Sequence, residues 1–208
     1  MRNQFTRIHL VVIAAGIFAG MVPPVLAQET IYSTLGAGDA YDTNNFVQFT
    51  NGFLSGRADR FTSLVTAEVG DVSLALEAVS AGSTITLTIR SESANGPGGV
   101  IGTFNSTPIS TDPGVVTFAA TDAFQLDAGT EYWVTAIASN GQTDWFLNDQ
   151  GIENFGASHT GISWTVDQVG STGLAFEVDG VPEPGTLALG VVGLAACCGR
   201  RARALTGS

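Results

Sequence analysis

The feature that most restricts the fold is a strict alternation of apolar and polar side chains from Ser83 to Arg90, STITLTIR. Successive side chains of a strand point to opposite faces, so this pattern is typical of a β-strand with one buried face. Residues 71–78, DVSLALEA, repeat it. The best helix candidate, residues 66–79, contains this alternation and is therefore expected to be a strand. We expect an all-β protein.

Other segments are rich in Val, Ile, Thr and aromatic residues, which favour strands: residues 46–49, 61–65, 100–104, 115–118, 132–137 and 174–178. Turn-forming residues separate them at 96–99, 111–114 and 127–130. About nine or ten short strands divided by such turns predict an antiparallel β-sandwich, jelly-roll-like in its strand order. Because no linker interrupts residues 28–180, we expect them to form one domain.

Basic residues are concentrated at the two ends of the chain. All eight are Arg, and only Arg57, Arg60 and Arg90 lie within residues 28–180, which hold eighteen carboxylates and a formal charge of −15. This charge argues against nucleic acid as a partner, because phosphates are bound mainly by Lys and Arg. Cations and neutral polymers such as glycans remain open. Both cysteines, Cys197 and Cys198, lie outside this region, so we expect no disulfide within it.

Residues 1–27 have the layout of a secretory signal peptide. Arg2 and Arg7 lie in a short cationic stretch, and an apolar run of 13 residues follows from Leu10 to Val22. Such a run is short for a membrane-spanning helix. We expect Sec-type export and cleavage between Ala27 and Gln28. An uncleaved membrane anchor is the alternative.

The C-terminal region combines three unlike features in order. Val181-Pro182-Glu183-Pro184 comes first, an uncharged run from Gly185 to Cys198 follows, and Arg200, Arg201 and Arg203 close it. Prolines favour an extended segment. The apolar run reaches about 21 Å as a helix, short of a hydrocarbon layer of about 30 Å, and arginines orient a helix end toward the cytoplasm. We expect a short transmembrane helix beside an accessible cleavage segment, with residues 204–208 as a tail.

This order resembles the PEP-CTERM sorting signal of Gram-negative bacteria over residues 181–208, and Pro182-Glu183-Pro184 matches its name-giving tripeptide. The resemblance implies an intermediate anchored in the inner membrane. An exosortase-type enzyme would then cut near the tripeptide and release the ectodomain or transfer it to the cell surface. The resemblance also implies association with exopolysaccharide. A plain single-pass anchor is the alternative.

A second resemblance covers about 145 residues. Its motifs are residues 35–41, 61–62, 72–76, 91–99, 126–134, Trp164 and 175–178. Together they are similar to the bacterial choice-of-anchor ectodomains, and most to type R. That family occurs with interchangeable C-terminal surface anchors and has no established catalytic function. The resemblance therefore implies a protein that is not an enzyme, and it assigns no functional residue.

Catalytic motifs are weak in the region between the termini. His159 is its only histidine, and Ser158 and Ser163 are its nearest serines, but sequence neighbours seldom form a triad and no G-x-S-x-G elbow occurs. No motif locates the two carboxylates of a glycosidase. A secreted hydrolase remains an alternative that needs His159 within hydrogen-bond reach of a serine, or two carboxylates close together in a cleft.

Two oxygen-rich runs are candidates for calcium, which prefers such ligands. The first holds Asp39, Asp42, Asn44 and Asn45, and the second holds Asp144, Asn148, Asp149, Glu153 and Asn154. Neither follows the pattern D-x-[DN]-x-[DN]-G. The alternative, which we favour, is that these side chains form turns and that no cofactor is bound.

The three tryptophans are candidates for contacts with sugar rings. Trp133 lies within an apolar strand and is expected in the core, whereas Trp145 and Trp164 have polar neighbours. If these two shared an exposed face they would form a glycan-binding platform, although core packing is the commoner use of an indole. The sequence thus predicts an exported, surface-associated structural or adhesive protein of the envelope or matrix. A glycan-binding module is the first alternative.

Overall fold

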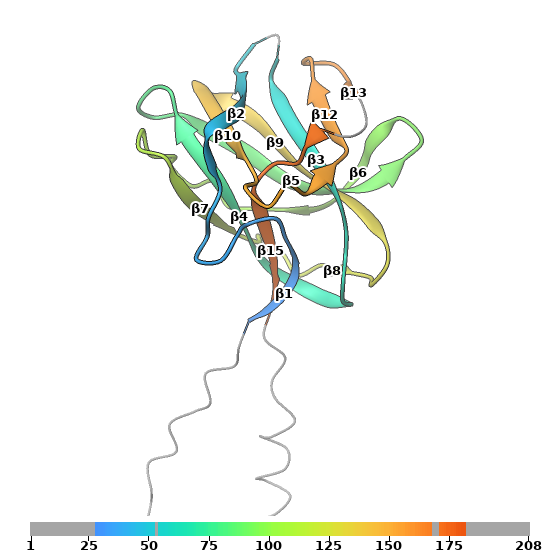
Figure 1. Ribbon diagram of the computed structural model, residues 1–208. Coiled ribbons are helices and arrows are strands. Elements are labelled where there is room, and N and C mark those ends of the chain that lie inside the picture. The colour runs from blue at the N-terminus through green and yellow to red at the C-terminus, as the bar shows by residue number, and fades with distance from the viewer. Residues whose placement is uncertain (1–27, 53, 168–170, 182–208) are drawn as a thin grey trace, which may run out of the picture.

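The computed structural model describes residues 28–52, 54–167 and 171–181. These residues form fifteen strands and no helix, and every strand pairing between them is antiparallel (Figure 1). The predicted all-β, antiparallel class is confirmed. Within this part of the chain, no helix is long and apolar enough to cross a membrane.

One large sheet has seven strands. Its hydrogen-bonded path is β1 (Glu29–Ser33), β15 (Phe176–Gly180), β4 (Ala67–Ala78), β10 (Gln142–Leu147) and β2 (Asp42–Thr50), and β7 (Gly114–Ala119) and β8 (Gln125–Leu126) also pair with β4. The longest strand, β4, is therefore the centre of this sheet. It contains the alternating residues 71–78 that the sequence assigns to a strand.

The second large sheet has six strands in the order β13 (Trp164–Val166), β12 (Gly156–His159), β3 (Gly56–Thr62), β9 (Glu131–Asn140), β5 (Thr84–Ser93) and β6 (Gly96–Thr103). The two edge strands of this sheet approach each other: a Cβ placed on Gly96 of β6 would lie 2.9 Å from Val166 Cγ2 of β13. The sheet is therefore strongly curved. A short pair, β11 (Glu153–Asn154) with β14 (Ser171–Thr172), completes the set.

The main core is built from both large sheets. Val72, Leu74 and Leu76 of β4 and Ile85, Leu87 and Ile89 of β5 are buried in one cluster. These are the apolar members of the two alternating runs, so both strand predictions are confirmed. Smaller clusters lie on the other faces of the sheets, one around Trp133 and one around Phe146.

Two sequence predictions about element limits are wrong. The strand expected at 61–65 is β3, which begins at Gly56 and ends at Thr62. The turn expected at 96–99 lies at Ala94 and Asn95, and Gly96 begins β6 with φ 107°. A positive φ suits glycine, so here glycine follows a two-residue turn and does not mark a longer break.

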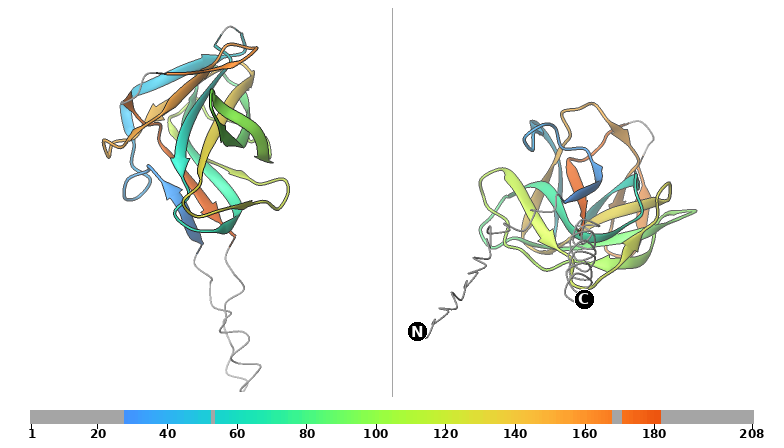
Figure 2. Two further views of the ribbon diagram at one scale, coloured as in Figure 1. Left: turned by 90° about the vertical axis from the view of Figure 1, so that its right-hand side faces the viewer. Right: turned by 90° about the horizontal axis from the view of Figure 1, so that it is seen from below.

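The first and last described strands are neighbours. In the β1–β15 pairing, Glu29 lies opposite Gly180. Figures 1 and 2 show both strands reaching the same end of the domain. Gln28 and Val181 therefore leave the domain side by side. The predicted signal peptide, the residues Pro182, Glu183, Pro184, Arg200, Arg201 and Arg203, and the expected transmembrane helix lie outside the described residues.

Candidate functional site

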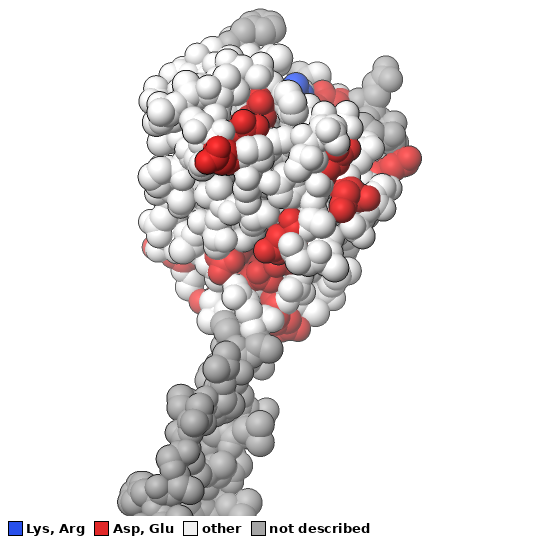
Figure 3. Space-filling model, turned by 60° about the vertical axis from the view of Figure 1, so that its left-hand side comes forward, with Lys and Arg blue, Asp and Glu red and all other residues white. Residues whose placement is uncertain are grey.

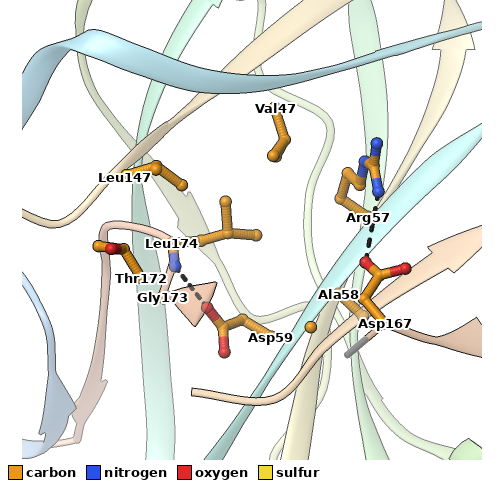
Figure 4. Close-up of a pocket in the computed structure, with 10 residues that line it drawn as sticks. Val47, Arg57, Ala58, Asp59, Leu147, Asp167, Thr172, Gly173 and Leu174 are labelled. Atoms are coloured by element: carbon orange, nitrogen blue, oxygen red, sulfur yellow. Dashed lines mark hydrogen bonds and ion pairs between the residues drawn. The ribbon is translucent and has the colours of Figure 1, made fainter. Parts of the chain in front are cut away.

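A cavity of about 170 Å³ lies between the two large sheets. Val47 of β2, Leu147 of β10 and Leu174 form an apolar part of its wall (Figure 4). The polar part comes from Arg57 and Asp59 of β3 and from Asp167 and Thr172. Both sheets thus contribute residues to this cavity, and the ionisable side chain of Asp59 lies on the inner side of its strand.

Asp59 is inside because of strand alternation. It lies two residues before Phe61, a member of the main core, so both side chains are on the inner face of β3. Asp59 is only 1% exposed. One carboxylate oxygen, Oδ2, accepts a hydrogen bond from the Leu174 backbone N–H at 2.5 Å, and the other, Oδ1, has no hydrogen-bond partner among the described residues.

Burial raises the pKa of Asp59 to about 8, although the Leu174 N–H and the Asn154 amide act to lower it. Desolvation disfavours the charged form of a carboxyl group. At neutral pH the group is therefore mainly protonated. Because Oδ2 accepts a hydrogen bond from Leu174, the proton belongs on Oδ1, which can then donate.

Arg57 and Asp167 lie at the solvent side of the cavity. The Arg57 Nη1 atom is 3.4 Å from Asp167 Oδ2, and the side chains of the two residues are 18% and 42% exposed. Arg57 also donates to Ser158 Oγ, which donates to Asp167 Oδ1 at 2.9 Å. The positive charge of Arg57 is thus balanced by a partner, and the cavity carries little net charge.

Asn154 lines a second cavity, of about 260 Å³. The Asn154 Oδ1 accepts a hydrogen bond from the Tyr32 hydroxyl at 3.3 Å. The Asn154 amide lies near enough to Asp59 to lower its pKa, although its Nδ2 has no partner in hydrogen-bond geometry in the described part of the chain. The Arg60 guanidinium covers the Phe155 ring at 3.8 Å from its centroid, and Glu131 pairs with Arg60 at 3.3 Å. The aromatic face here is occupied by Arg60.

Trp145, a candidate for contact with a sugar ring, has no exposed surface. It is completely buried in the main core, where its indole Nε1 donates to the Ala175 carbonyl at 2.9 Å. Trp164 is half-buried on β13 of the other sheet, with its ring 4.8 Å from that of His159. The two tryptophans do not share an exposed face, so the core packing that we favoured holds for Trp145 and the alternative of a platform does not include it. Trp133 is buried as expected, in the small cluster with Ala58 and Ala157.

His159 does lie within reach of a serine, but the serine is Ser55. The distance from Ser55 Oγ to His159 Nδ1 is 2.7 Å. Since Nδ1 also accepts the Gly161 N–H at 3.2 Å, it carries no proton and the serine donates to it. Desolvation, and secondarily Arg90, lower the pKa of His159, which favours this neutral form.

This pair closes the end of the β3–β12 ladder. The Ser55 backbone N–H donates to the His159 carbonyl at 2.9 Å, and among the described residues no carboxylate hydrogen-bonds to the imidazole ring. Ser55 itself is only 8% exposed. A triad needs an accessible nucleophile and a group that orients the base, so the geometry fits a structural contact. Ser158 instead contacts Arg57 and Asp167.

The residues of the first calcium candidate hold one another. Asp42 accepts the Asn44 backbone N–H at 2.9 Å and the Asn45 Nδ2 at 2.7 Å. These hydrogen bonds lower the pKa of Asp42, and the bond from the Asn45 side chain has the largest effect. Asp39, with φ 63°, lies in the preceding loop. An Asp side chain that accepts the backbone N–H two residues on is the local bond of an Asx-turn, here at the start of β2, where the pairing with β10 is irregular.

The second candidate is dispersed. Asp144 is buried within β10 and accepts from Gln48 Nε2 at 2.8 Å, while Asp149 is exposed in the following turn and accepts from Gln150 at 2.6 Å. Asn148 donates to two backbone carbonyls, of Ile152 and Gly173. Across the residues described, no group of three or more His, Cys, Asp or Glu side chains is placed to hold a metal ion.

Asp59 was not among the predicted site residues. The signal that the sequence offers is a carboxylate two positions before a core aromatic in Gly56–Thr62, GRADRFT. In comparisons with known proteins, no family model matches the chain and no curated protein matches it.

Proposed function

We propose that this chain is an exported, surface-associated structural or adhesive protein. Its ectodomain is a jelly-roll-like β-sandwich, and a PEP-CTERM-type signal at residues 181–203 directs its sorting. The observation that carries the proposal is the pairing of β1 with β15, in which Glu29 lies opposite Gly180. A leader and a C-terminal anchor both hold the chain at the membrane until the leader is cleaved, and this pairing places both connections at one end of the domain, which supports the proposal.

The opposite end of the domain would then face away from the membrane. Figure 1 shows the β12–β13 hairpin there, and Ile162 in that hairpin is 94% exposed. Contacts with other molecules of the envelope or matrix would be made from this end and from the sides. Export machinery and an exosortase-type enzyme are the partners that the two terminal segments imply.

The charge of the domain supports a body that stays in water. Asp and Glu side chains recur over the face in Figure 3, whereas Arg is almost absent from it. With a formal charge of −15 for residues 28–180, anionic lipid surfaces repel the domain. A soluble body held by a short membrane segment satisfies both constraints.

Replacing Pro182, Glu183 and Pro184 together by alanine tests the sorting signal. We expect the wild-type protein from its native cells to lack the residues after the tripeptide, and the variant to keep them and to remain in the inner-membrane fraction. Intact mass and terminal peptides measure this directly. The matched control is Pro113→Ala, which changes a proline of the turn before β7.

An identical C-terminal mass in wild type and triple variant would rule out processing at the tripeptide. The same experiment reports the N-terminus, which we expect at Gln28. Detection of Met1 in the protein from native cells would instead establish the uncleaved anchor.

A further inference from the structure

The cavity at Asp59 has the size of one six-membered ring. Its volume is about 170 Å³, and an engineered apolar cavity of about 150 Å³ in another protein accepts one benzene molecule. A longer ligand would not fit inside, although one end of it would. The size therefore selects a single ring or the terminal ring of a chain.

The charges around the cavity select an uncharged ligand. The charge of Arg57 is balanced by Asp167 at 3.4 Å, so this ion pair leaves no unpaired carboxylate for a cation. Asp59 is mainly protonated at neutral pH, because burial raises its pKa to about 8. An anion would meet a protein whose residues 28–180 carry a formal charge of −15. Arg57 Nε is a buried donor without a hydrogen-bond partner among the described residues, and the oxygen of a neutral hydroxyl can accept from it as an anion would.

One polar atom at the cavity needs a hydrogen-bond partner of a particular kind. Asp59 Oδ1 is a buried carboxyl oxygen with no partner in hydrogen-bond geometry among the described residues; the Asn154 amide lies near enough to lower the pKa of the carboxyl group but does not complete such a bond. A buried polar atom in this state is unfavourable until a partner satisfies it. A hydroxyl group can satisfy it in either protonation state, because a hydroxyl both donates and accepts. On the same wall, Val47, Leu147 and Leu174 offer an apolar surface to the C–H face of a ring.

We propose that this cavity binds one uncharged, hydroxyl-bearing six-membered ring, such as a neutral sugar unit or a cyclitol. A ring hydroxyl hydrogen-bonds to Asp59 Oδ1, and the ring packs on Val47, Leu147 and Leu174. Arg57 and Asp167 form the rim through which the ring enters. The carboxylate of this ion pair is 42% exposed, and exposed ion pairs are weak, so the pair can separate during entry. This site does not depend on the export and sorting proposed above.

The test is an NMR titration of the full-length chain in dodecylphosphocholine micelles, which contain no sugar. The probes are glucose and myo-inositol, with glucosamine and glucuronate as charged analogues. The reporter is the Leu174 amide, which donates to Asp59. We expect saturable shifts of this amide with a neutral probe, and an affinity at least about tenfold weaker for both charged analogues.

Two variants of Asp59 separate binding from folding. Asp59→Asn keeps an acceptor for the Leu174 N–H and places an amide donor where the protonated Oδ1 lies, so we expect its affinity to stay within about threefold of wild type. Asp59→Leu fills the same space without a polar group, and we expect at least a tenfold loss. The matched control is Asp112→Asn in an exposed turn, which should bind as wild type.

Circular dichroism checks that each variant keeps its β structure. If Asp59→Leu does not fold, Asp59→Asn and the charged analogues still decide the question. An absence of saturable Leu174 shifts with both neutral rings would overturn the proposal. Binding that Asp59→Leu leaves unchanged, or tighter binding of either charged analogue, would overturn it equally.

Discussion

Asp59 places a carboxyl group where strand alternation puts apolar side chains. Its neighbour two residues on, Phe61, is a core residue, while Asp59 itself keeps one unpaired oxygen. Protein interiors rarely contain such a group without a reason in function or in a bound partner. This residue therefore places a buried carboxyl group beside the apolar side chains of the cavity wall.

The pKa of Asp59 predicts how stability depends on pH. The folded-state value of about 8 exceeds the ordinary value of 3.8, so the folded state holds a proton that the unfolded state releases. The resulting stability is fully present below about pH 4 and is lost as the pH rises toward 8. We expect the free energy of unfolding of wild type to fall over this range relative to Asp59→Asn, which cannot titrate.

Chemical denaturation at pH 5, 7 and 9 measures this difference. Two other carboxyl groups make stability fall with rising pH in the same way. Burial and the charge of Glu177 raise the pKa of Asp179 to about 6, and burial raises the pKa of Asp71. Both groups are present in the wild type and in the variant, so their contributions cancel in the comparison. The charged or titratable neighbours of Asp59 are Tyr32, Arg57 and Asp167. Parallel curves for the two proteins would show that Asp59 is ionised in the folded state.

At the scale of elements, alternation of apolar and polar residues predicted β4 and β5 but not β10. β4 and β5 were found because Val72, Leu74, Ile85 and Leu87 recur at every second position. β10 was missed because Thr143, Asp144, Trp145 and Phe146 are all buried. Trp145 faces the main core and Phe146 faces another cluster, so polar and apolar residues no longer distinguish the faces.

The cavity could not be predicted for a related reason. Its wall joins β2, β3 and β10 with the residues around β14, which are far apart in the sequence. No local pattern encodes which of them meet across the space between two sheets. The turns were easier to predict: residues 111–113 and 127–130 lie outside strands, and Gly114, the last residue of the first expected turn, begins β7. Pro, Gly and Asp act through their own backbone preferences.

The end of the β3–β12 ladder provides an element-scale prediction. Ser55→Ala removes the hydrogen bond from Ser55 Oγ to His159 Nδ1 at 2.7 Å, and we expect the free energy of unfolding to fall by about 1 kcal/mol. Hydrolysis of p-nitrophenyl acetate should be the same in wild type and variant. Esterase activity that disappears with Ser55 would instead support the hydrolase alternative. Ser163→Ala, in the exposed β12–β13 loop, is the control.

For the whole molecule, the excess of carboxylates acts against compactness. Residues 28–180 carry a formal charge of −15, and like charges repel more strongly in the folded state, where they are closer together. Salt screens this repulsion, with a Debye length of about 10 Å at 0.1 M ionic strength. We therefore expect the melting temperature of the full-length chain in zwitterionic micelles to rise by a few degrees between 20 and 500 mM NaCl, about the shift that 1 kcal/mol produces in a domain of this size.

Differential scanning calorimetry measures this shift. A neutral osmolarity control, glycerol at matched osmolality, distinguishes screening from general exclusion. A melting temperature that falls with salt would mean that the few ion pairs, such as Arg60 with Glu131, outweigh the repulsion.

The position of β15 has a mechanical consequence. This strand lies between β1 and β4 and is hydrogen-bonded to both. A pull on Val181 directed along the strand would therefore load two ladders in shear at the same time, so that their bonds would have to break together and not one by one. A domain held through this strand would resist drag from flowing liquid better than one held through an edge strand, which can be peeled away.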